Sequence, residues 1–109
     1  METVVALPQI TDMRRFVQSI LCERDNLDLG QTPLYEAPLK KDGRICGLYF
    51  EVQGPRLLRS SAIWTEEESR LLFYDSTGDR FAEIRLSEAP SLEQVRGKSE
   101  SEKPQADAA

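Results

Sequence analysis

The sequence predicts an α+β fold in which one N-terminal amphipathic helix packs on a four- to five-stranded antiparallel β-meander. Apolar residues recur with a helical period of about 3.6 over residues 11–24. Between residues 34 and 86 the period changes to roughly 2, which is typical of strands. Beyond these runs the composition becomes polar, and a disordered C-terminal tail is expected.

The helix is expected to begin near Thr11, which stands where an N-cap residue belongs, with Asp12 near the positive end of the helix dipole. One stripe of the helix is apolar and consists of Met13, Phe16, Val17, Ile20 and Leu21. The pattern runs to about Arg24, and Asp25-Asn26 then supplies a stop. We therefore expect the apolar stripe to face the core.

Short apolar runs separated by turn residues define the predicted strands. The runs cover residues 34–40, 44–52, 56–64, 70–75 and 80–86. Links such as Lys41-Asp42-Gly43 are short enough to make neighbouring strands antiparallel. Pro38 makes the first run an edge strand, because proline cannot donate a hydrogen bond to a ladder. The sequence leaves open whether residues 4–7 form a further strand.

Alternation within the runs predicts which side chains face the core. The expected inner face carries Cys46, Leu48, Phe50, Val52, Leu58, Ala62, Trp64, Leu72, Tyr74, Ala82, Ile84 and Leu86. The expected outer face carries Tyr49, Glu51, Arg59, Glu83 and Arg85, together with Leu57, Ile63, Leu71, Phe73 and Phe81. A face that mixes tyrosine, arginine and apolar residues is typical of an interface, so we predict the five residues named first as binding residues.

The chain is expected to fold as one small domain over residues 1–90, followed by a disordered tail over residues 91–109. The tail is rich in Ser, Glu, Lys, Pro, Gln and Ala, and its only sizeable apolar residues are Leu92 and Val95. Such a segment buries too little apolar surface to offset the entropy lost on ordering.

Composition excludes several classes of function. The 109 residues include no histidine, which removes histidine-based triads, general bases and metal ligands. Lys and Arg number 14 against 19 Asp and Glu, and the formal net charge of -5 argues against a protein that binds nucleic acid by neutralising phosphates. Tyr49, Phe73 and Phe81 are the aromatic residues that an RNA-binding sheet would use, but no RNP-like motif accompanies them. We expect no metal and no cofactor.

Cys22 and Cys46 are expected to be reduced thiols on buried faces, since their spacing fits no CxxC motif. The first residues lack a basic region followed by a long apolar core. No stretch approaches the ~18 to 20 continuous apolar residues that a membrane span needs. We therefore expect a cytoplasmic protein that does not contact a membrane.

One string suggests a catalytic role for Asp75, which ends an apolar strand and is followed by Thr77 and Gly78. It resembles the phosphorylated-aspartate loop of P-type ATPases, which reads Asp-Lys-Thr-Gly-Thr, although Ser76 and Asp79 differ. The resemblance implies a nucleophilic carboxylate, but that chemistry also needs a parallel α/β sheet and further Mg²⁺-binding acids. A hairpin turn with Gly78 at positive φ accounts for the same residues, and we predict no catalytic residue.

The predicted function is a protein-interaction or regulatory module whose partner is another protein or a second copy of the chain. Residues 1–90 contain nine arginines and only two lysines, and arginine is favoured where planar hydrogen bonding or stacking matters. The alternative is a small-molecule-binding domain with a cavity between helix and sheet. An enzyme that uses the Asp75 carboxylate is a third possibility.

Overall fold

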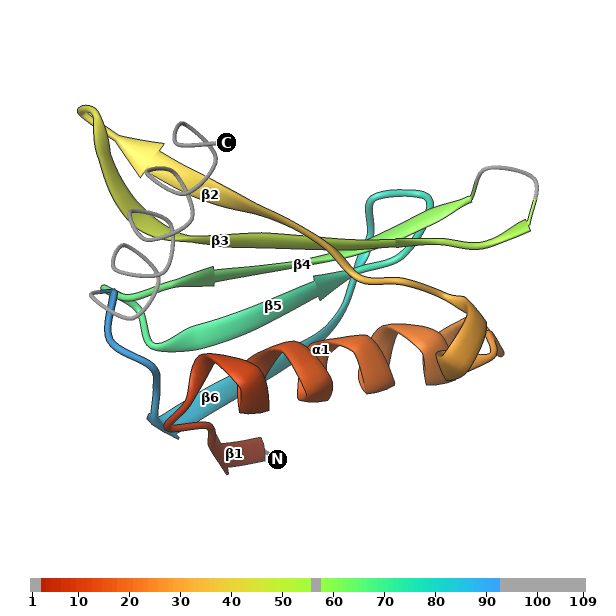
Figure 1. The fold of residues 1–109 in the computed structure, drawn as a ribbon, viewed down its shortest axis with the longest axis horizontal. Coiled ribbons are helices and arrows are strands. Elements are labelled where there is room, and N and C mark those ends of the chain that lie inside the picture. The colour runs from red at the N-terminus through yellow and green to blue at the C-terminus, as the bar shows by residue number, and fades with distance from the viewer. Residues whose placement is uncertain (1–2, 56–57, 93–109) are drawn as a thin grey trace, which may run out of the picture.

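The computed structural model describes residues 3–55 and 58–92. In this part of the chain one α-helix, α1 (Ile10–Arg24), packs on one face of a six-stranded sheet (Figure 1). The predicted α+β class is confirmed, with more strands than the expected four to five. Nearly all of the expected tail lies outside the described residues.

The strands follow the predicted runs within a few residues. They are β1 (Thr3–Ala6), β2 (Tyr35–Lys41), β3 (Arg44–Gln53), β4 (Arg59–Thr65), β5 (Arg70–Tyr74) and β6 (Arg80–Glu88), and a short 3₁₀ helix, η1 (Leu29–Gln31), precedes β2. Their order across the sheet is β1-β6-β5-β4-β3-β2. From β2 to β6 each strand pairs antiparallel with the next, as the short links predict.

β1 is the strand that the sequence left open. It runs parallel to β6, with Thr3 opposite Ile84 and Val5 opposite Leu86. Four residues are too few to show alternation, and the partner strand is distant in sequence, so no local signal could reveal the pairing. The connection from β1 through α1 to β2 carries the chain from one edge of the sheet to the other (Figure 1).

The helix begins at Ile10, and its N-cap is Gln9 instead of the expected Thr11. The Gln9 N–H donates to the Asp12 carboxylate at 3.2 Å, so Asp12 closes the first turn from inside the helix. At the other end Asn26 adopts a φ of 56°, and the chain leaves the helix there, as predicted.

The core lies between α1 and one face of the sheet. Of the five predicted stripe residues, Met13, Val17 and Leu21 are completely buried in it, and Phe16 and Ile20 are partly buried and pack against it. The sheet contributes Leu48, Phe50, Val52, Ala62, Trp64, Leu71, Phe73, Ile84 and Leu86. Burying one such side chain stabilises the fold by about 1.5–3 kcal/mol, so this layer provides the main driving force for folding.

The predicted core residues are wrong for β5. Leu71 pairs with Trp64, and directly opposed residues point to the same face of a sheet. Leu71 and Phe73 are therefore buried, whereas Leu72 and Tyr74, which were expected inside, point outwards. Residues 71–74 are apolar or aromatic at every position, so alternation alone could not select the inner face.

Two further residues depart from the expected faces. Leu58, expected in the core, is exposed just before β4 begins, and Leu57 lies outside the described residues. Phe81, expected outside, packs against Phe73 with ring centroids 6.0 Å apart. The β5–β6 register shifts next to Tyr74, and this irregularity turns Phe81 towards the core.

Polar bonds attach the end of the helix and the following loop to the fold. Ser60, completely buried in β4, donates its hydroxyl hydrogen to the Asp25 carboxylate just beyond α1. The Gln18 side-chain amide donates to the Thr32 carbonyl at 2.7 Å. A buried polar group left without a partner costs about 1–3 kcal/mol, so these bonds favour one position of the helix on the sheet.

Gly47 permits the close approach of β3 and β4. A Cβ at this position would lie 2.0 Å from the Trp64 carbonyl oxygen, a backbone atom that a side-chain rotation cannot move. We expect Gly47→Ala to lower the free energy of unfolding by about 1–3 kcal/mol. Urea unfolding followed by the fluorescence of Trp64 measures this change. Gly30→Ala is the matched control, since the nearest atom to its Cβ would lie at 3.6 Å. An equal loss in both variants would contradict this account.

Candidate functional site

The candidate site is the face of the sheet opposite α1. Within residues 3–55 and 58–92, α1 is the only α-helix and packs on the inner face, so no described element covers the other face. We call the outward-pointing side chains of β2 to β6 the open face. Its chemistry follows from which residues the register brings side by side.

The register arranges the open face in three rows across the strands. The middle row is Ala37, Tyr49, Ile63, Leu72 and Glu83. The row nearer the β4–β5 turn is Leu39, Gly47, Thr65, Arg70 and Arg85. The third row is Tyr35, Glu51, Ser61, Tyr74 and Arg80, with Arg59 beyond it on β4. Ile63 and Leu72 form an apolar centre, and the charged residues surround them.

All five predicted binding residues lie on the open face, and three of them form one group. The Glu51 carboxylate accepts a hydrogen bond from the Tyr49 hydroxyl at 2.7 Å. The same carboxylate lies 3.8 Å from the Arg59 guanidinium. Burial raises the pKa of the Tyr49 phenol, and its bond to Glu51 adds to this effect. Tyr49 therefore remains a neutral donor held in one orientation by Glu51.

The other two predicted residues belong to a second group, on β5 and β6. Glu83 forms an ion pair with Arg70 and lies 3.8 Å from the Arg80 guanidinium. Arg85 stands directly opposite Arg70 across the two strands. Sequence reasoning did not include Arg70 and Arg80 in the site, because only the register shows that both surround Glu83.

Two of the three aromatic residues considered for RNA binding are not on the open face. Phe73 is completely buried, and Phe81 packs beside it. The Arg24 guanidinium at the end of α1 lies 5.0 Å from the centre of the Phe81 ring. Of the three, only Tyr49 is on the open face, where Tyr35 and Tyr74 accompany it.

Asp75 lies in the turn between β5 and β6, where its carboxylate is engaged by the turn itself. The Thr77 and Asp79 backbone N–H groups each donate to Asp75 Oδ1 at 3.0 Å, and the Thr77 hydroxyl donates to the same oxygen at 2.7 Å. Gly78 has a φ of 89°, as the turn interpretation predicts. The Thr77 hydroxyl is the largest cause of a lowered pKa at Asp75. This geometry is that of a capped hairpin turn, and it supports no nucleophilic role.

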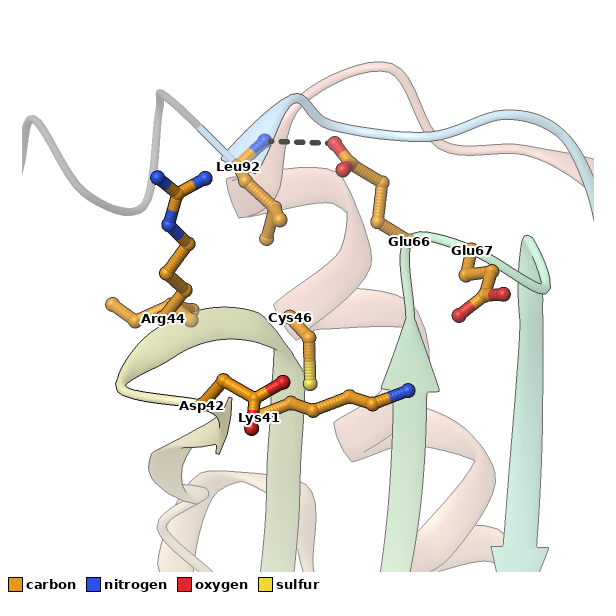
Figure 2. Close-up of a pocket in the computed structure, with 8 residues that line it drawn as sticks. Lys41, Asp42, Arg44, Cys46, Glu66, Glu67 and Leu92 are labelled. Atoms are coloured by element: carbon orange, nitrogen blue, oxygen red, sulfur yellow. Dashed lines mark hydrogen bonds between the residues drawn. The ribbon is translucent and has the colours of Figure 1, made fainter.

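A rim pocket of about 460 Å³ lies at the end of the sheet, between the β2–β3 hairpin, the β4–β5 turn and Leu92 (Figure 2). Its lining residues are Lys41, Asp42, Arg44, Ile45, Cys46, Glu66, Glu67 and Leu92. Leu92, which the sequence assigned to the tail, is 6% exposed, and its N–H donates to the Glu66 carboxylate at 3.4 Å. Charges of both signs line the pocket, so it favours no single class of ligand.

The two cysteines differ in their surroundings. Both are free thiols, as predicted, but only Cys22 is buried, whereas Cys46 is half-buried and lines the rim pocket. Burial raises the pKa of the Cys22 thiol. In the part of the chain that the structure describes, no group of three or more acidic or cysteine side chains is placed to hold a metal ion. The same residues include no helix with the length and apolar character for a membrane crossing.

Comparison with known proteins adds no assignment to this geometry. No family model matches the sequence, no curated protein matches it, and no solved structure matches the chain.

The exposure of the two thiols predicts selective alkylation. Iodoacetamide should modify Cys46 faster than Cys22 by roughly tenfold or more in the folded protein, because access and thiolate character set the rate. Mass spectrometry of digested samples taken over time measures both rates. In Cys46→Ser the fast phase should disappear, and full modification of Cys22 should require denaturant. Equal rates at the two thiols in native buffer would contradict the structure.

The hydrogen bonds at Asp75 predict a pH dependence of stability. A pKa lowered by folding means that the ionised carboxylate stabilises the fold above about pH 4, the ordinary aspartate value, and that this contribution disappears as the pH falls through the lowered pKa. Asp75→Asn should therefore be less stable than the wild type at neutral pH, and the difference should shrink in acid. Thermal unfolding across the acidic range measures it. Parallel curves for the two proteins would refute this role.

Proposed function

We propose that the protein is a protein-interaction module that binds a different protein on its open face. The observation that carries this proposal is the middle row, where Ile63 and Leu72 lie half-buried beside Tyr49 on a face that no described element covers. Apolar side chains surrounded by tyrosine and arginine have the composition of protein interfaces.

The edges of the sheet support binding by the face instead of by strand addition. β2 is one edge, and it contains Pro38, which cannot donate to an added strand, followed by Lys40 and Lys41. β1 is the other edge and has only four residues. Proline, lysine and short length are the means by which sheets avoid edge pairing, so the open face is the larger available surface.

The other expectations from the sequence find less support. A ligand cavity between helix and sheet would lie among Met13, Val17, Phe50 and Trp64, but these four side chains pack together in one core cluster. A second copy would need its Glu51 or Glu83 to meet the arginines of the first, and both carboxylates are already paired within the chain. A cytoplasmic location stays a prediction from the sequence.

Leu72→Glu is expected to weaken binding of the partner by about 2 kcal/mol, which is the size of effect seen at the centre of interfaces. The substitution places a carboxylate on the apolar centre of the open face while leaving the inner face unchanged. Leu29→Glu is the matched control, because Leu29 is an exposed leucine at η1, outside the open face. Far-UV circular dichroism checks that both variants are folded.

The binding measurement uses a photo-crosslinking amino acid in place of Ile63 in cells that express the full chain. We expect the crosslinker to capture one discrete partner, which mass spectrometry identifies. Untagged wild-type protein or the Leu29→Glu variant, added as a competitor, should suppress this crosslink. The Leu72→Glu variant, added in the same way, should not. The same crosslinker in place of Leu29 serves as the background. Crosslinks of equal yield at both positions, or suppression by all competitors alike, would rule out the open face as the site.

A further inference from the structure

We infer that the turn between β2 and β3 is a site of covalent modification, where Asp42 converts to isoaspartate. In isoaspartate the chain continues through the side-chain carboxyl group instead of the backbone one. This inference goes beyond the proposed function and does not depend on it. It follows from three features of the turn: the residue after Asp42, the room around Gly43, and the unpaired carboxylate of Asp42.

The reaction needs no reagent other than water. The backbone nitrogen of Gly43 attacks the side-chain carboxyl carbon of Asp42, and a cyclic imide forms. The hydroxyl of the protonated carboxyl group leaves with the amide hydrogen as a water molecule. Another water then adds to the ring carbonyl that came from the backbone, and the bond from that carbonyl to the nitrogen breaks. The product has the same mass as the original chain, and no group is oxidised or reduced.

The sequence of the turn favours this reaction. Asp42 is the only aspartate in the chain that precedes a glycine. Because glycine has no Cβ, its backbone nitrogen is the least hindered one for the attack. Asp42 and Gly43 have φ values of 55° and 79°, and they form the whole turn, since Lys41 already pairs with Arg44.

The tip of the hairpin has room to reach the geometry of the ring. The Gly43 nitrogen must turn towards the Asp42 side chain, so the backbone of the turn has to rotate. Both residues are exposed, and a Cβ built on Gly43 would meet no atom within 4 Å beyond its chain neighbours. Opening an exposed tip of an edge hairpin costs little free energy compared with unfolding the core. The surrounding fold therefore does not obstruct the rotation.

The Asp42 carboxylate is not held by the fold. Within residues 3–55 and 58–92 it is the only aspartate side chain without a hydrogen bond or an ion pair. The other described aspartates each accept at least one hydrogen bond, and they are Asp12, Asp25, Asp28, Asp75 and Asp79. In Figure 2 the Asp42 side chain lines the rim pocket and no hydrogen bond joins it to its neighbours.

Asp75 provides a comparison within the same molecule. It also lies at a hairpin turn, and the residue that follows it, Ser76, is small and exposed. Its Oδ1 atom, however, accepts hydrogen bonds from the Thr77 N–H, the Thr77 hydroxyl and the Asp79 N–H. These bonds fix the orientation of the carboxyl group, so it is not free to turn towards the Ser76 nitrogen. We therefore expect Asp75 to resist the reaction.

Conversion of Asp42 would change the turn and the rim pocket together. The path from Asp42 to Gly43 becomes longer by one backbone atom, and the former backbone carbonyl becomes a carboxylate on Cα. A two-residue turn has fixed dimensions, so the pairing of Lys41 with Arg44 would be disturbed. Lys41, Asp42 and Arg44 all line the rim pocket, which would change its shape while keeping its charge.

The test incubates the folded, full-length chain at neutral pH and physiological temperature and follows isoaspartate over time. A protein isoaspartate methyltransferase with labelled S-adenosylmethionine measures the amount, and electron-transfer fragmentation of digested samples locates the residue. We expect Asp42 to convert in a single first-order phase, with no isoaspartate at Asp75 when half of Asp42 has reacted. The same chain in guanidinium chloride shows how fast Asp42 reacts without the fold. Conversion there but not in the folded chain, or conversion of another described aspartate before Asp42, would overturn the inference.

Two variants at position 42 check the chemistry. Asp42→Asn should react faster, because ammonia leaves more readily than water, and the product should show the mass gain of a lost amide. Asparagine before glycine also suits this turn, so the variant should fold. Asp42→Glu keeps the charge but should lose the product, since its longer side chain would have to close a larger ring. Far-UV circular dichroism checks that both variants are folded. Isoaspartate in Asp42→Glu at the wild-type yield would place the modification elsewhere and overturn the assignment.

Discussion

One helix can cover only one face of a six-stranded sheet, and the rest of the molecule follows from this constraint. The stripe of α1 buries Met13, Val17 and Leu21 against the inner face, which is apolar almost throughout. In the described part of the chain, the opposite face is in contact with water. Its side chains must therefore interact with water and also pack against their neighbours on adjacent strands. Tyrosine and arginine meet both demands, because each combines an apolar body with a polar end.

The sequence predicts whatever depends on local periodicity. The helix stripe and the strands of the meander show a periodicity that does not depend on how the strands pair. The positions of Tyr49 and Glu51 on the outer side of β3 therefore follow from alternation alone. The faces of β5 do not, because residues 71–74 are apolar on both sides and only pairing with β4 distinguishes Leu71 from Leu72. Periodicity does not reveal β1, because it has only four residues and its partner, β6, is distant in sequence.

The candidate site, too, could be predicted only as far as local periodicity allows. Five of its residues could be assigned to one face from single strands, but their grouping required the register. Glu83 is paired with Arg70 and Arg80 because the β5–β6 register places these side chains close together. The register shift beside Tyr74 turns Phe81 away from this face. The carboxylates of the open face therefore act within the chain. Glu51 and Glu83 hold guanidinium groups in place, and under the proposed function this would lower the entropy cost of binding a partner.

The parallel pairing of β1 with β6 has a consequence for the order of assembly. β1 is synthesised before every other described strand, but its partner is the last of them, so it has nothing to pair with until the meander is complete. The β2 to β6 hairpins close short loops, whereas the β1–β6 contact closes nearly the whole described chain and carries the largest loop entropy. A four-residue strand on an outer edge is also weakly held. The β1 edge is therefore the last part of the sheet to form and the first to exchange its amide hydrogens.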